Sequence, residues 1–204
     1  MRRGLLTRVT RFQDLHGRRT RVTTRQFQSL AGVQLAAMEM ELEAENWSGN
    51  VTVRSMIDGR VSNRNVAADR ELAGHHLEAV DSREVDGETV LLETMTNQSQ
   101  VRIAVATRTS VLSNGDTNPM RRPVSEGELV AGHDISVNLD TGRPVKLEKI
   151  ASVANSHDHA ISTVWHSAVK RVQRASSFRT MLTYHEEMWG VLWHRFAVSI
   201  GADR

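Results

Sequence analysis

Apolar and polar residues alternate along the chain between positions 38 and 43. Met38, Met40 and Leu42 occupy one phase, and glutamates fill the positions between them. Successive side chains of a β-strand point to opposite faces of its sheet, so this alternation predicts a half-buried strand. The segment 45–49 (Glu-Asn-Trp-Ser-Gly) is then rich in turn residues, and Val51 and Val53 resume the alternation. The pattern predicts two strands joined by a turn.

Short strand-like segments of this kind fill the chain from Gly4 to about Val153. They include 90–92, 101–106, 135–139 and 145–147. Turn signals separate them at regular intervals. Many short strands with regular turns predict a mainly β fold, and we expect an antiparallel β-sandwich rather than helices in this part of the chain.

Several of the turns have a recognisable chemistry. The Asp86-Gly87 pair easily adopts the positive φ angles of a type I′ turn, so it predicts a tight hairpin. Asp140-Thr141-Gly142 predicts a second turn. The segment 113–128 contains Asn-Gly, Asn-Pro, Arg-Arg-Pro and Glu-Gly, and it predicts a long loop.

The hydrophobic period changes from 2 to 3.6 near Ser156, which predicts two α-helices within 157–195. Asp158 is the expected N-cap of the first helix, and Ser176 or Ser177 that of the second. The apolar faces are Ile161, Val164, Trp165, Ala168, Val169 and Val172 in the first helix, and Phe178, Met181, Leu182, His185, Trp189, Leu192 and Phe196 in the second. We therefore expect a β-domain at 1–155 and a helical linker at 156–204, ending in a strand-like segment at 196–200.

Composition narrows the class of protein. A chain of 204 residues can form one sizeable domain with an appended piece, and its 39% hydrophobic and 25% charged content are ordinary for a globular protein. The chain has no cysteine, which excludes disulfides and thiolate metal sites and is compatible with a cytoplasmic location. The sequence contains no long uncharged apolar run and no secretory signal, so we expect no membrane association.

The positive charge is concentrated at the N-terminus. Residues 1–25 carry eight arginines and one aspartate, a net charge of +7, while the whole chain carries +2. Such a segment could bind nucleic acid. However, Leu6, Val9 and Phe12 are interleaved with the arginines, and Val22 and Phe27 follow. We therefore expect two strands that bury these apolar residues in a sheet, joined by a turn at 16–18, and no specific nucleic-acid binding.

The sequence gives little support for a catalytic or metal-binding site. Three segments hold histidine beside histidine or aspartate: 75–76, 133–134 and 157–159. Neighbouring strand residues point to opposite faces, and a capping role explains Asp158, so no metal site is expected. Ser156-His157-Asp158 contains the residue types of a catalytic triad, but a triad converges through the fold rather than along the chain. Trp47 is the one aromatic residue to consider for carbohydrate contact, although a plug between sheets is the preferred interpretation.

The order of several segments resembles the N-terminal domain of glycoside hydrolase family 65, which includes phosphorylases of maltose, trehalose and kojibiose. The matching segments cover most of the chain and are Met1–Arg8, Phe27–Leu30, Leu35–Ala37, Glu45–Gly49, His76-Leu77, Val101–Arg108, Gly142–Lys149, Ser156–Ser162, His185–Trp189 and Leu192–Phe196. The resemblance implies a galactose-mutarotase-like super-sandwich followed by linker helices. It also implies that Met1 is an internal methionine and that upstream strands are missing.

In such enzymes the helices lead to an (α/α)6 barrel. There a glutamate protonates the glycosidic oxygen, and phosphate or water attacks the sugar. By resemblance, these residues lie beyond position 204, so no catalytic, cofactor-binding or metal-binding residue is assigned in this chain, and no cofactor. The glutamates at 39–45 are expected to lie solvated on the polar face of a strand. The implied partner is the barrel of the same enzyme, and carbohydrate would be met only through the complete enzyme. A homodimer is also compatible.

Three functions remain open at this level. The first is the non-catalytic N-terminal region of a glycosidase or disaccharide phosphorylase that acts on α-glucosides. The second is a free-standing carbohydrate-binding β-sandwich module, and the third is an unrelated interaction domain that uses its basic strands. The helical tail favours the first, because a free-standing module has no need of helices with a wide apolar face.

Overall fold

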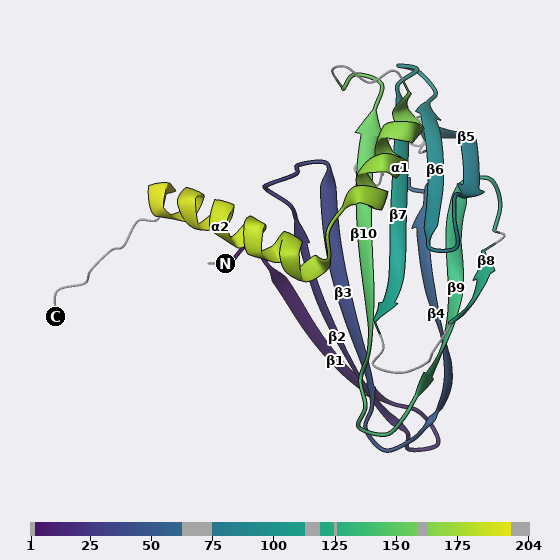
Figure 1. Ribbon diagram of the computed structural model, residues 1–204. Coiled ribbons are helices and arrows are strands. Elements are labelled where there is room, and N and C mark those ends of the chain that lie inside the picture. The colour runs from purple at the N-terminus through teal and green to yellow at the C-terminus, as the bar shows by residue number, and fades with distance from the viewer. Residues whose placement is uncertain (1–2, 63–74, 113–118, 125, 159–162, 197–204) are drawn as a thin grey trace, which may run out of the picture.

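The computed structural model describes residues 3–62, 75–112, 119–124, 126–158 and 163–196. Two antiparallel β-sheets face each other, and two helices follow them in the chain (Figure 1). The sequence prediction of a mainly β protein with an antiparallel sandwich and two C-terminal helices is confirmed. Among the described helices, none is long and apolar enough to cross a membrane.

The larger sheet has seven strands and the smaller sheet has three. The larger sheet has the order β1 (Leu6–Gln13), β2 (Arg19–Gln28), β3 (Leu35–Ala44), β10 (Val145–Asn155), β7 (Arg102–Leu112), β6 (Thr89–Thr96), β5 (Leu77–Glu84). The smaller has the order β4 (Gly49–Asp58), β9 (Val130–Leu139), β8 (Met120–Pro123). Consecutive strands often belong to different sheets, as β3 and β4 do, and β9 and β10 do as well.

Alternate residues of the large sheet point to its two faces, one towards the small sheet and the other towards the helices. The inner face packs on the small sheet through a core that includes Leu42, Leu147 and Val145 opposite Ile135 and Val137. The outer face carries the helices. Three layers therefore follow one another, namely the small sheet, the large sheet and the helical layer (Figure 1).

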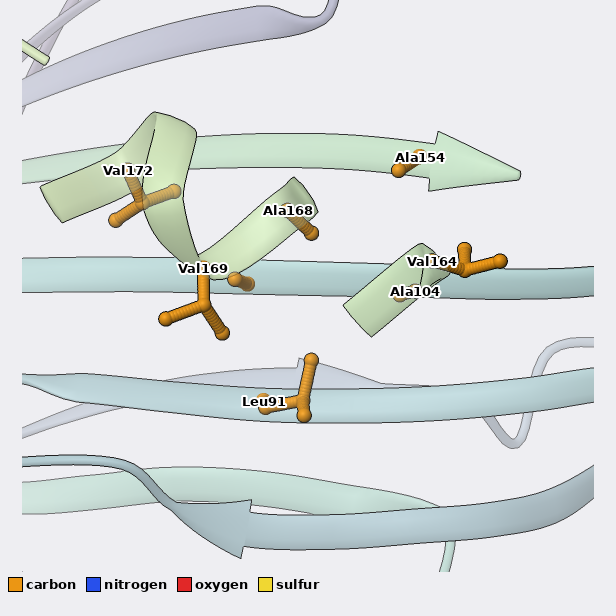
Figure 2. Packing of buried hydrophobic residues seen from close by; sticks show 8 residues of the cluster. Leu91, Ala104, Ala154, Val164, Ala168, Val169 and Val172 are labelled. Carbon is orange, nitrogen blue, oxygen red and sulfur yellow. The ribbon is translucent and has the colours of Figure 1, made fainter. Parts of the chain in front are cut away.

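α1 (Val164–Arg174) lies on the outer face of β6, β7 and β10 (Figure 2). Four alanines with no exposed surface line this contact: Ala104, Ala106, Ala154 and Ala168. Small side chains let the helix approach the sheet closely, while Leu91 and Val172 fill the space on either side. The alternation at 101–106 thus predicts β7, and the alanines at 104 and 106 are the residues of this strand that face the helix and are fully buried.

A side chain outside the helix holds the C-terminal end of α1. Arg108 donates hydrogen bonds to the carbonyl oxygens of Gln173 and Ala175, at 3.2 and 3.0 Å, which satisfies acceptors at the C-terminus of the helix. The residue before the helix is Thr163, not the expected Asp158. Asp158 instead accepts hydrogen bonds from the backbone and side-chain nitrogens of Asn155, so it stabilises the end of β10.

Gly132 permits the close approach of two strands in the small sheet. It pairs with Met56 in the β4–β9 ladder, and an added Cβ would lie 2.6 Å from both the Met56 Cβ and the Ser55 carbonyl oxygen. No real Cβ tolerates such distances, so the strands would have to separate.

We expect Gly132→Ala to lower the free energy of unfolding by about 1–3 kcal/mol, the usual range for overpacking a core. Gly190 in the second helix is the matched control, because nothing lies within 4 Å of an added Cβ there. Gly190→Ala is expected to raise stability by about 0.5–1 kcal/mol, since alanine suits a helix interior better. Urea denaturation followed by circular dichroism measures both, and equal effects of the two variants would contradict the packing argument.

Three local predictions from the sequence are wrong or incomplete. The 85–88 hairpin forms, but Gly87 has no positive φ, and the Asp86 carboxylate accepts amide hydrogen bonds from Glu88 and Thr89 in place of a type I′ turn. The 113–128 segment includes the short strand β8, which pairs with β9. Phe196 ends a helix rather than opening a strand, and residues 197–200 lie outside the described part of the chain.

The apolar residues of β1 are also not buried as expected. Val22 and Phe27 of β2 do pack into the two sides of the sheet, but Leu6, Val9 and Phe12 of β1 are exposed. The reason is position in the fold, because β1 is the edge strand of the large sheet. Leu6 and Phe12 lie on its inner face and Val9 on its outer face, and neither face is fully covered at this edge.

Candidate docking surface

The second helix begins at a buried carboxylate. α2 (Phe178–Phe196) follows Ser177, whose hydroxyl accepts a hydrogen bond from the Thr180 amide at 3.3 Å. This confirms Ser177 as the cap. Glu148 of β10 is buried on the outer face, and its carboxylate accepts a 2.6 Å hydrogen bond from the Phe178 amide. A negative charge at a helix N-terminus is favourable because the first amides there are unpaired and point towards it.

The first turns of α2 are packed on the outer face of β2, β3 and β10. Phe178, Met181 and Leu182 form a buried cluster with Phe27 and Ile150. The ring of Phe178 meets Phe27 edge-on, with centroids 5.3 Å apart, and the Arg25 guanidinium lies 5.5 Å from the Phe178 ring centroid. This part of the helix is therefore an integral part of the domain.

His185 joins α2 to two other segments. Its Nδ1 accepts a hydrogen bond from the Leu30 amide at 3.3 Å, and its Nε2 lies 3.2 Å from the Gly4 carbonyl oxygen. The amide can only donate and the carbonyl can only accept, so the ring is the neutral tautomer with its proton on Nε2. Phe27 and Trp189 flank this buried ring.

The N-terminal segment fits against the same part of the helix. Gly4 adopts a positive φ of 58°, and an added Cβ would lie 2.5 Å from His185 Nε2. Arg3 is paired with Glu186, and the hydrogen bond and charge of that carboxylate raise the pKa of Arg3.

The apolar stripe of α2 continues beyond the sheet. Its members are Phe178, Leu182, His185, Trp189, Leu192 and Phe196, and the steps of four and three residues between them keep all six on one side of a helix. Exposure rises along the stripe from 1% at Phe178 to 38% at Leu192 and 77% at Phe196, and Trp193 beside it is 41% exposed. Figure 1 shows the C-terminal part of α2 extending away from the sandwich.

We call Leu192, Trp193 and Phe196 the distal stripe. Soluble proteins rarely expose several large apolar side chains side by side unless a partner covers them. Because the same helix face is buried about two to four turns before Leu192, the distal stripe is the clearest candidate for an interaction surface in the described part of the chain.

The basic N-terminal strands are largely neutralised on the outer face. Arg21 and Arg25 of β2 lie opposite Glu43 and Glu39 of β3 and form ion pairs with them. The remaining glutamates of β3 and of the turn after it are paired as well: Glu41 with Lys146, and Glu45 with Arg11. The glutamates therefore form a ladder with the cations rather than a bare solvated face, and the concentration of charge at the N-terminus does not create a continuous basic surface there.

The histidines and aspartates considered as metal ligands in the sequence do not come together in one site. His76 precedes β5, and His133 is buried on β9 with its Nε2 3.5 Å from a Glu84 carboxylate oxygen. Asp134 faces the other way, where its hydrogen bond with Arg54 lowers its pKa. Among the described residues, no group of three or more His, Asp or Glu side chains could hold a metal ion. His159 lies outside the described residues.

Ser156, Asp158 and Trp47 make hydrogen bonds that stabilise the fold. Ser156 accepts a hydrogen bond from the Arg102 amide, and Asp158 bonds to Asn155, so neither side chain is oriented towards the other. The Trp47 indole donates to the Arg19 carbonyl and the Thr20 hydroxyl, and its ring packs against the core between the sheets. This geometry favours the plug between sheets over a sugar platform.

The fold and the exposed helix thus define a two-sheet β-domain with two attached helices. Comparison with known proteins agrees. The model of the glycosyl hydrolase family 65 N-terminal domain matches residues 1–192, and the chain belongs to that family. An uncharacterized glycosyl hydrolase of Mycobacterium tuberculosis is 38% identical over 98% of the chain.

Two other curated relatives are phosphorylases. A kojibiose phosphorylase of Halothermothrix orenii is 24% identical over 97% of the chain, and an α,α-trehalose phosphorylase of Thermoanaerobacter brockii is 23% identical over 100% of it. The solved structure of a putative kojibiose phosphorylase from human microbiome has the same fold, with a TM-score of 0.76, 10% identity and coverage of 94% of this chain and 24% of that one.

The chain spans only part of each relative. It covers 15% of the Mycobacterium tuberculosis protein, 26% of the kojibiose phosphorylase and 27% of the trehalose phosphorylase. In these relatives the domain is therefore one portion of a larger enzyme.

Two charged residues of β10 have roles that the sequence patterns do not predict. The buried Glu148 caps α2, and the half-buried Lys149 donates a 2.9 Å hydrogen bond to the Met56 carbonyl oxygen of the small sheet. One signal was available: Lys149 occupies the same strand phase as Val145 and Leu147, so a cation stands where the alternation predicts an apolar residue.

Proposed function

We propose that this chain serves as the non-catalytic N-terminal region of a cytoplasmic glycosidase or disaccharide phosphorylase that acts on α-glucosides. In this role α2 docks on an (α/α)6 catalytic barrel and helps to shape one wall of the active-site entrance. The observation that carries the proposal is the distal stripe, an apolar helix face that the sandwich leaves uncovered. Family membership and the larger size of the relatives support it.

The proposal predicts no turnover by the chain alone, because it assigns the acid that protonates the glycosidic oxygen to the barrel. Purified chain is incubated with maltose, trehalose or kojibiose, with and without inorganic phosphate. The expected release of glucose and glucose 1-phosphate equals that of a blank without protein. The same purification from cells that lack the gene is the control for contamination. Release of sugar above both the blank and this control would contradict the proposal.

A further inference from the structure

The inner face of the large sheet extends beyond the small sheet and forms a ledge with a cavity on it. Residues paired directly across β1, β2, β3 and β10 form one row on this face: Leu6, Gln26, Met38 and Lys149. The next row begins at Gln28 and continues through Ala36 and Ala151. Both rows line a cavity of about 490 Å³, a volume typical of small-molecule sites.

Lys149 stands where the ledge meets the small sheet. Beside it, Thr109 of β7 bonds to Ser55 of β4 at 2.8 Å, and the Lys149 ammonium reaches the Met56 carbonyl oxygen of the same strand. This one hydrogen bond uses one of its three N–H donors. Lys149 forms no ion pair with any carboxylate that the structure describes. Burial lowers the pKa of Lys149 to about 8, which is the effect expected when an ammonium loses water without gaining an opposite charge.

Charge is distributed unevenly between the two faces of these four strands. On the outer face, cations stand beside glutamates in the ladder described above. On the inner face, the paired rows at Leu6, Arg8 and Thr10 contain two cations, Arg8 and Lys149, and no carboxylate. The ledge therefore offers an uncompensated positive charge next to a cavity.

The residues that line the floor and sides of the cavity indicate which chemical groups a ligand would carry besides its anionic group. Ala36 and Ala151, paired with each other and both half-buried, leave an accessible apolar floor, and Met38 and Leu6 extend it. The Gln28 side chain donates to the Val33 carbonyl at 2.7 Å, and the Gln26 carboxamide is exposed beside it. An ammonium, carboxamides and an apolar floor together suit a small molecule with an anionic group, hydroxyl groups and an apolar ring face.

We propose that this ledge cavity binds a small organic oxyanion about the size of a monosaccharide, a phosphate ester or carboxylate bearing hydroxyl groups, whose anionic group pairs with Lys149. The alternative is that Lys149 only ties β10 to the edge strand β4. A tether of that kind affects stability but not ligand affinity, so the two roles separate when binding and stability are measured on the same variants.

The test titrates the whole chain with glucose 1-phosphate, gluconate and glucose, using calorimetry and ¹H–¹⁵N NMR. Lys149→Gln removes the ammonium, and Lys146→Gln is the matched control, because Lys146 lies on the same strand, faces the other side and pairs with Glu41. Ala151→Leu fills the floor while leaving Lys149 in place. Thermal unfolding establishes that each variant is folded.

We expect glucose 1-phosphate or gluconate to bind and to shift the side-chain amide signals of Gln26 and Gln28. Lys149→Gln and Ala151→Leu should each weaken this binding at least tenfold, and Lys146→Gln should change it less than twofold. Glucose should bind at least tenfold more weakly than the anions. Failure of both anions to bind, equal binding of glucose, or unchanged affinity in folded Lys149→Gln would each overturn the proposal. None of these results bears on the docking role of α2.

Discussion

Replacing the distal stripe with glutamine will convert a self-associating, dye-binding chain into a monomeric, dye-silent one. Burial of a large apolar side chain is worth about 1.5–3 kcal/mol, so Leu192, Trp193 and Phe196 together favour association by several kcal/mol. The wild-type chain is therefore expected to form oligomers at micromolar concentration and to bind a hydrophobic dye. Size-exclusion chromatography with light scattering and dye fluorescence measure the two properties.

The matched control removes apolar residues from another side of the same helix. Tyr184 and Val191 are 56% and 52% exposed, and their spacing of seven residues places them together, away from the stripe. A variant with glutamine at both positions should associate as the wild type does. If it becomes monomeric while the stripe variant does not, the interaction surface has been assigned to the wrong side of α2.

The two ends of the stripe should respond very differently to the same substitution. Phe178→Ala is expected to lower the free energy of unfolding by about 3–5 kcal/mol, because it empties a buried site between Phe27 and the helix. Phe196→Ala is expected to change it by less than about 0.5 kcal/mol, the usual limit for an exposed position. Denaturant unfolding measures both at a concentration where the chain is monomeric. Similar losses would mean that the distal part of α2 is packed on the domain after all.

Several strands were predictable because each of them has a clear local pattern. Met38, Met40 and Leu42 mark β3 through their alternation with glutamates, and Ile135, Val137 and Leu139 mark β9. The partner of each strand was not predictable from the same pattern. β3 and β4 are joined by a short turn yet lie in different sheets, and this assignment depends on contacts with β10 and β9 more than 70 residues away.

Exposure at the edges of the fold also depends on distant parts of the chain. The sequence of β1 predicts buried Leu6, Val9 and Phe12, but the strand lies at the edge of the large sheet and all three are exposed. In α2, one periodic stripe is buried at Phe178 and exposed at Phe196 because the sheet beneath it ends. The periodicity predicts the face, and only the extent of the sheet decides how much of that face is covered.

Of the candidate docking surface, the helix, its apolar face and the Ser177 cap were predictable from spacing. The roles of Glu148 and His185 were not, because each joins segments that are far apart in sequence. Asp158 illustrates the same limit. It is a good capping residue at a plausible position, but its carboxylate accepts hydrogen bonds from Asn155 instead of from the helix amides.

Association with a catalytic portion tests the central claim most directly. The chain is co-expressed with the part of the Mycobacterium tuberculosis relative that follows the matched region, and complex formation is measured by affinity co-purification and light scattering. We predict a one-to-one complex with the wild-type chain and with the Tyr184 and Val191 control, and no complex with the distal-stripe variant. A wild-type chain that is monomeric, dye-silent and indifferent to the catalytic portion would contradict the account, and a free-standing carbohydrate-binding module would then explain the chain better.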